Sequence, residues 1–260
     1  MIINKYPKKN ILAILNKEGR EIYGFDEIVK LSGLDRKHVW YILSRLKNKG
    51  RLIRLEKGKY LYVPEGFEGN WTGNSYLIAS NLIKPYAIAY WSALNYWHYT
   101  EQIPSTIFIQ SVKRKLHKTK NIFGVEYKLI TVGKSNFFGL TTIWENHRKI
   151  KITDKEKTII DCLDYPEYCG GLSELIKGVQ YGFKNKELNV RKLINYAGRI
   201  SNRTVMKRLG YILEKSKIRL SEKLINKIRN KISEGYSLLD PTMPNTGKLN
   251  SRWRLKLNLF

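Results

Sequence analysis

The sequence has few acidic residues and few cysteines, and it contains no long apolar run. Its 260 residues include two cysteines, seven prolines and 22 Asp+Glu against 48 Lys+Arg, so the formal net charge is +26. No stretch approaches the roughly 18 consecutive apolar residues of a membrane span. The longest early apolar run, Ile11 to Leu15, is too short for a signal peptide. We therefore expect a cytoplasmic protein with no membrane partner.

Motifs of catalysis and cofactor binding are also missing. The chain has neither a phosphate-binding glycine loop nor the glycine pattern of dinucleotide-binding proteins. Cys162 and Cys169 are too few for a disulfide framework, and no histidine cluster surrounds them, so we expect Cys162 to be a small buried apolar residue. We expect no cofactor and no metal, and the chain is not expected to be an enzyme.

One alternative to that expectation stays open at an acidic helix. Asp161 and Asp164 lie three residues apart, on one face of the helix predicted to follow Thr153. Thr153 with Glu156 three residues later fits a capping box at its start. Two carboxylates on one face could hold Mg²⁺ and serve a metal-dependent reaction, but no other residue of the sequence converges on them.

The composition that is present predicts a folded protein. Hydrophobic residues make up 42% of the chain and aromatic residues 12%, which is enough for a substantial core. The positive charge is uneven: residues 1–63 carry a net +9 and residues 184–232 a net +12, so these two segments hold +21 of the +26. Such basic segments favour nucleic acid or an acidic protein surface as a partner.

The first sixty-three residues read as a helix-turn-helix. Apolar spacing and end signals predict helices over 8–18, 25–31 and 35–49, with Gly19 and Gly33 as stops and Asp35 as an N-cap. The turn between the second and third helices is short and contains glycine, which is typical of this motif.

The third predicted helix has two contrasting faces. Val39, Ile42, Leu43 and Leu46 share one side and are expected to pack inward. The other side carries rings, cations and hydrogen-bonding groups that could enter a major groove. We predict base reading by Lys37, Trp40, Tyr41 and Ser44, phosphate contacts by Arg36 and Arg45, and a further DNA contact by Asn48.

A hairpin over 52–63 is predicted to follow as the wing of a winged helix-turn-helix. A two-residue turn at Lys57-Gly58 would place Glu56 opposite Lys59 and Leu55 opposite Tyr60. The basic residues of this hairpin complete the predicted DNA-binding set: Arg54, Lys57 and Lys59.

The whole chain is predicted to be an α+β protein. The winged helix-turn-helix of residues 1–63 and a linker over 64–73 precede a mixed α/β region over 74–183 and a basic helical region with a terminal strand over 184–260, which we expect to belong to the same C-terminal domain.

Several short motifs, in a shared order, resemble the AbiEi antitoxins of AbiE-type toxin–antitoxin systems and related winged-helix regulators. The N-terminal ones are Gly50-Arg51-Leu52-Ile53-Arg54 and Lys57-Gly58-Lys59-Tyr60. The central ones are Tyr90-Trp91-Ser92-Ala93-Leu94 and Thr100-Glu101-Gln102-Ile103-Pro104, where Tyr99 replaces a glycine common in the family, then Phe137-Phe138-Gly139 and the segment from Lys155 to Asp164 with Pro166 and Gly170-Gly171. A terminal match is Trp253-Arg254-Leu255-Lys256-Leu257-Asn258.

This resemblance implies a repressor that binds double-stranded DNA at inverted repeats in its own operon and counteracts a toxin of the nucleotidyltransferase type. It assigns no toxin-counteracting residues, and it does not account for residues 184–232. Two alternatives remain open: a solitary winged-helix regulator, and an RNA- or protein-binding module that uses the basic C-terminal helices.

Overall fold

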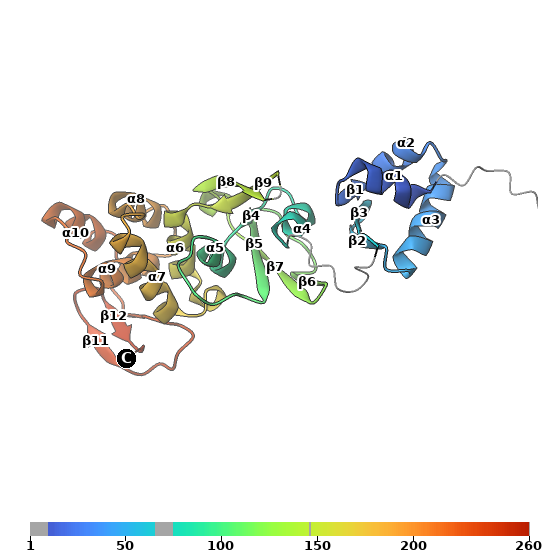
Figure 1. The fold of residues 1–260 in the computed structure, drawn as a ribbon. Coiled ribbons are helices and arrows are strands. Elements are labelled where there is room, and N and C mark those ends of the chain that lie inside the picture. The colour runs from blue at the N-terminus through green and yellow to red at the C-terminus, as the bar shows by residue number, and fades with distance from the viewer. Residues whose placement is uncertain (1–9, 66–74, 146, 260) are drawn as a thin grey trace, which may run out of the picture. The chain divides into compact units, whose positions relative to one another are not determined.

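The structure is a computed structural model that describes residues 10–65, 75–145 and 147–259. The chain divides into two compact units, residues 1–73 and 74–260 (Figure 1). Both units combine helices with sheets, so the protein belongs to the α+β class, as predicted. Most of the predicted linker, residues 66–73, lies outside the described residues.

The helices of the first unit follow the signals at their ends. The Asn10 side chain caps α1 by accepting hydrogen bonds from two backbone N–H groups, and Asp35 caps α3 in the same way. Gly19 and Gly33 follow α1 and α2 in the left-handed conformation that glycine adopts without strain. The helices are α1 (Ile11–Glu18), α2 (Phe25–Ser32) and α3 (Arg36–Asn48).

A short strand, β1 (Ile22–Gly24), was not predicted from the sequence. It pairs antiparallel with β3 (Lys59–Tyr62), so that the sheet order is β1-β3-β2 with β2 spanning Leu52–Glu56. Three residues are too few to show the alternation that marks a strand. Tyr23 within β1 is fully buried, and its hydroxyl donates to the Leu15 carbonyl at 2.6 Å, which ties the strand to α1.

The predicted register of the hairpin is correct only at its turn. Glu56 pairs with Lys59 as expected, but a β-bulge between Arg54 and Glu56 shifts the remaining pairs, so that Arg54 lies opposite Tyr60. The side chain of Leu55, which lies at the bulge, is fully buried. Hydrophobic burial of this side chain therefore overrides the simple two-residue alternation.

The second unit is built on a mixed sheet of six strands in the order β6-β7-β5-β4-β9-β8. The β5–β7 and β4–β9 pairs are parallel, and the other pairs are antiparallel. The strands are β4 (Ala87–Ile88), β5 (Thr106–Ser111), β6 (Thr119–Ile122), β7 (Val125–Thr131), β8 (Leu140–Glu145) and β9 (Arg148–Thr153).

Helices surround α6 (Lys155–Asp164), in which most side chains are buried. It contacts helices from both halves of this unit, including two from the basic region, whose apolar faces enter the same core. The others are α4 (Ser75–Leu82), α5 (Tyr90–Tyr96), α7 (Leu172–Lys184), α8 (Val190–Ala197), α9 (Thr204–Lys215) and α10 (Glu222–Arg229).

A small sheet ends the chain, in the order β10-β12-β11. The buried ring of Trp253, just before β12, packs directly against the Cα of Gly210 in α9, where any Cβ would overlap the indole. The strands are β10 (Ser237–Leu238), β11 (Lys248–Asn250) and β12 (Leu255–Leu257).

Two details at α6 differ from the sequence prediction. Its N-cap is Asp154, whose side chain accepts from the Lys157 N–H, whereas Thr153 closes β9 and is buried. Cys162 is buried as expected, but it forms a disulfide with Cys169, which the sequence did not predict. The turn at Pro166–Tyr168 brings the two Cα atoms to 5.7 Å.

A buried ion pair lies along α6. The Lys157 ammonium donates to Asp161, one turn later, and neither side chain has appreciable contact with solvent. Burial raises the pKa of Asp161 to about 6 although Lys157 opposes that shift. A charge left alone here would be costly, because burial deprives it of solvation.

We predict that Asp161→Asn lowers the free energy of unfolding by about 3 kcal/mol, since it leaves the Lys157 charge buried and unpaired. The double variant Lys157→Met/Asp161→Leu removes both charges and is expected to lose less. Lys177→Gln, which breaks an exposed ion pair with Glu174, should have little effect. Urea denaturation of the three variants measures these differences; a double variant less stable than Asp161→Asn would contradict the account.

Candidate nucleic-acid interface

The orientation of α3 is fixed by its buried side. Val39 and Leu43 are fully buried in the core of the first unit together with Leu15 and Ile28. Ile42 and Leu46 pack against the same core while partly exposed. The opposite side of the helix therefore faces away from this core.

That outward side carries the predicted base-reading residues. Trp40 is 64% exposed and Tyr41 57%, the most exposed aromatic side chains of the first unit's described residues. Lys37, Arg45 and Asn48 are also exposed, and Ser44 is half-buried. We define these six residues as the α3 outer face: Lys37, Trp40, Tyr41, Ser44, Arg45 and Asn48.

The cations of this face have few internal partners. The Arg45 guanidinium lies 5.8 Å from the centroid of the Tyr41 ring, an arrangement that orients the ring and the charge together. Within the described residues, Lys37 and Arg45 form no ion pair with a carboxylate. A positive charge held next to an exposed ring, without a carboxylate, is available to a phosphate or a base edge.

Arg36 has a different environment from its neighbours. Its guanidinium pairs with Asp26 and lies 5.0 Å from the ring centroid of Phe25, both in α2. These contacts connect α2 to α3 across the turn. The structure therefore gives Arg36 an internal role that the sequence did not predict, in addition to its place at the start of α3.

One exposed cation lies at the hairpin turn. Lys57 is exposed and forms no ion pair within the described residues, and Gly58 takes a φ of +74°. The Phe25 N–H donates to the Gly58 carbonyl at 2.7 Å, so the turn is held against the start of α2. The Lys59 ammonium lies 3.8 Å from the Glu56 carboxylate. The Arg54 guanidinium donates to the backbone carbonyl of Glu56 at 3.3 Å.

The basic segment 184–232 uses several of its charges internally. The buried Arg208 guanidinium donates to the carbonyls of Leu163 and Leu239 at 2.6 and 2.8 Å, and the buried Lys207 ammonium donates to Gly235. Lys192 pairs with Glu156 at 2.7 Å. The net +12 of this segment therefore overstates the charge that it offers to a partner.

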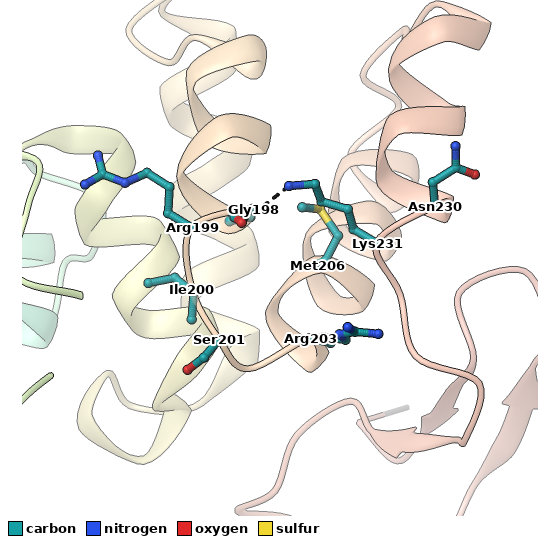
Figure 2. A pocket seen from close by; sticks show the side chains of 9 residues that line it. Gly198, Arg199, Ile200, Ser201, Arg203, Met206, Asn230 and Lys231 are labelled. Atoms are coloured by element: carbon teal, nitrogen blue, oxygen red, sulfur yellow. Dashed lines mark hydrogen bonds between the residues drawn. The ribbon is translucent and has the colours of Figure 1, made fainter. Parts of the chain in front are cut away.

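A cavity of about 420 Å³ in this region is rich in cations (Figure 2). Figure 2 shows Arg199 pointing away from it, and that guanidinium lies 3.5 Å from the Phe138 ring centroid. Lys231 reaches across it to the Gly198 carbonyl at 3.4 Å. The C-terminal ends of α8 and α10 border the cavity. Helix C-termini attract cations, so the basic side chains around the cavity interact favourably with these two helix ends.

The two carboxylates of the acidic alternative, Asp161 and Asp164, lie in different surroundings. Asp161 is held by Lys157, whereas Asp164 accepts from the Asn202 amide at 2.8 Å. The two carboxylates thus have separate partners. The described ranges contain no group of three or more His, Cys, Asp or Glu side chains placed to hold a metal ion. Over the same ranges, every helix is too short or too polar to traverse a lipid bilayer.

Comparisons with known proteins define the fold but nothing finer. No protein-family model matches the chain, and no curated protein matches it. Among solved structures, the chain is similar to the crystal structure of the RV2827C protein from Mycobacterium tuberculosis, with a TM-score of 0.68 and 13% sequence identity. The match covers 94% of this chain and 89% of that one. At this identity the similarity concerns the fold alone.

Proposed function

We propose that residues 1–63 form a winged helix-turn-helix that binds double-stranded DNA, and that the chain is a transcriptional repressor. The observation that carries this proposal is the α3 outer face, where two exposed rings stand beside cations that have no carboxylate partner in the part of the chain that the structure describes. Exposed aromatic pairs on a small helix are costly unless a partner covers them. A major groove admits an α-helix and offers acceptors, donors and thymine methyl groups to such a face.

Different side chains would contact different parts of the DNA. Lys37, Tyr41 and Ser44 would reach base edges, and Trp40 would pack on a thymine methyl or the groove wall. Arg45 and Asn48 lie farther along α3 and would contact the backbone beside the groove. Lys57 at the hairpin turn would act as the wing contact, with Arg54, Lys59 and Arg36 as supporting cations at the edge of the interface.

The second unit would make the protein an AbiEi-like antitoxin. This part of the proposal rests on the motif resemblance over residues 90–171, and most of those residues lie in or next to the core around α5 and α6. The chain would then repress its own operon and counteract a nucleotidyltransferase-type toxin. Its binding site would be an inverted repeat in duplex DNA.

We predict that Tyr41→Ala and Ser44→Ala alter sequence preference more than overall affinity. Duplexes selected from a random library by the unaltered protein provide the reference sites. Each substitution is expected to cost roughly 1–3 kcal/mol on a selected site and much less on random duplex, because a base contact is lost. Titration of both duplex types at one salt concentration measures the difference. Equal losses on both would refute a base-reading role.

Lys57→Ala should instead weaken binding to all duplexes alike. A lost phosphate contact releases one counterion fewer, so the slope of log affinity against log salt is expected to fall by about one. Lys17→Ala removes another exposed cation, from α1, and serves as the control. If the Lys57 variant keeps the slope of the unaltered protein, the hairpin turn is not a wing contact.

The antitoxin part predicts a neighbouring gene for a nucleotidyltransferase-like toxin, and growth rescue when this chain is expressed with it. Deleting residues 1–63 would then abolish repression. A gene that stands alone would favour the alternative of a solitary winged-helix regulator, and it would leave the DNA-binding proposal untouched.

A further inference from the structure

An exposed tryptophan lies on the edge hairpin of the second unit. Strand β8 ends the six-stranded sheet and pairs antiparallel with β9 (Figure 1). Trp144 of β8 is 64% exposed, although Ile143 beside it and Ile150 on β9 are buried on the opposite face. The alternation of the strands thus separates an apolar inner face from an outer face that holds a large ring.

Two lysines share the outer face with this ring. Trp144 is directly opposite Lys149, and Thr142 is directly opposite Lys151, so all four side chains project to the same side. The Lys149 ammonium lies 5.1 Å from the centroid of the Trp144 ring, and the Lys151 ammonium donates to the Thr142 hydroxyl at 2.7 Å. We call these four residues the Trp144 platform: Thr142, Trp144, Lys149 and Lys151.

Within the described residues, no ion pair compensates the charge of the platform. Both lysines are exposed, and over the described residues neither forms an ion pair with a carboxylate. Glu145 alternates to the other face. There, burial raises the pKa values of Tyr76 and Tyr96, and the nearby Glu145 carboxylate raises them further. The platform therefore combines a solvent-exposed aromatic ring with two ammonium groups, and none of its four residues is acidic.

We propose that the Trp144 platform binds single-stranded nucleic acid, by stacking an unpaired base on the indole and holding the flanking phosphates with Lys149 and Lys151. Aromatic rings on an open sheet face beside cations are the arrangement that suits unpaired bases, because each base has a π-face and each nucleotide a negative charge. Bases of a duplex are already stacked on one another and cannot use the ring. This role is separate from the duplex-binding role proposed for α3.

The test compares full-length variants on labelled twelve-nucleotide oligo(dT), oligo(U) and a mixed-sequence duplex. Trp144→Ala is expected to weaken single-strand binding roughly tenfold and to leave duplex binding within about twofold. Trp144→Phe should retain most of the affinity, since it keeps a ring. Lys149→Gln with Lys151→Gln should lower the single-strand salt slope by about 0.7 per lost contact. The two single strands distinguish RNA from DNA as the preferred source.

Matched controls separate this role from others. Leu249→Ala removes a comparably exposed apolar side chain from β11 and should change neither titration. Trp40→Ala should weaken duplex binding instead. Quenching of tryptophan fluorescence by oligo(U) should be smaller in Trp144→Phe than in the unaltered chain. In that variant the base stacks on a phenylalanine ring, which contributes nothing to the tryptophan fluorescence.

Three results would overturn the proposal: equal losses on single strands and duplex, no loss on either, or a change only in oligomeric state by light scattering. The last result would mean that the edge of β8 pairs with a second copy of the chain. Circular dichroism of each variant confirms that the comparisons concern folded protein.

Discussion

The burial of one side of α3 is the constraint on which the rest of the proposed function depends. Val39 and Leu43 have no contact with solvent, so the helix cannot rotate about its axis without exposing them at a cost of about 1.5–3 kcal/mol each. Because the inner side is fixed, Trp40 and Tyr41 are held outward at 64% and 57% exposure. The hydrophobic effect thus positions the polar and aromatic surface that a DNA groove would contact, although it acts on none of those residues directly.

The distribution of cations shows a second principle of this molecule. The formal charge of +26 suggests a surface that is basic everywhere, yet Lys157 and Arg208 are buried, and Arg36 joins two helices through Asp26. Such residues satisfy carbonyls and carboxylates of the fold. Among the described residues, cations without a carboxylate partner lie beside an exposed ring on α3 and on the β8–β9 hairpin. The combination of ring and charge, rather than net charge, therefore singles out the candidate surfaces.

Much of the local structure could be predicted because its causes are local. Asp35 caps a helix, and Gly19 and Gly33 follow helix ends, as predicted, through contacts within a few residues. The first helix is capped by Asn10, although the prediction had it begin at residue 8. The structure departs from these predictions where a contact distant in sequence is decisive. Leu55 departs from the expected register at a β-bulge, where its side chain is buried. The Cys162–Cys169 disulfide depends on a turn that brings the two residues together. Strand β1 exists because β3 is there to pair with it.

The candidate interface on α3 was accessible to sequence reasoning, since one helix carries both its apolar stripe and its outer face. The Trp144 platform was not, because its four residues come from two strands whose pairing only the folded chain reveals. Local patterns in the sequence predict the glycine stops of α1 and α2, the Asp35 cap and the sidedness of α3, and the composition gives the excess of positive charge. The tertiary structure determines which cations pair within the fold, which aromatic rings are buried and which strand lies at the edge of a sheet. The reason is physical: periodicity and capping act over a few residues, whereas burial and strand pairing depend on partners far along the chain.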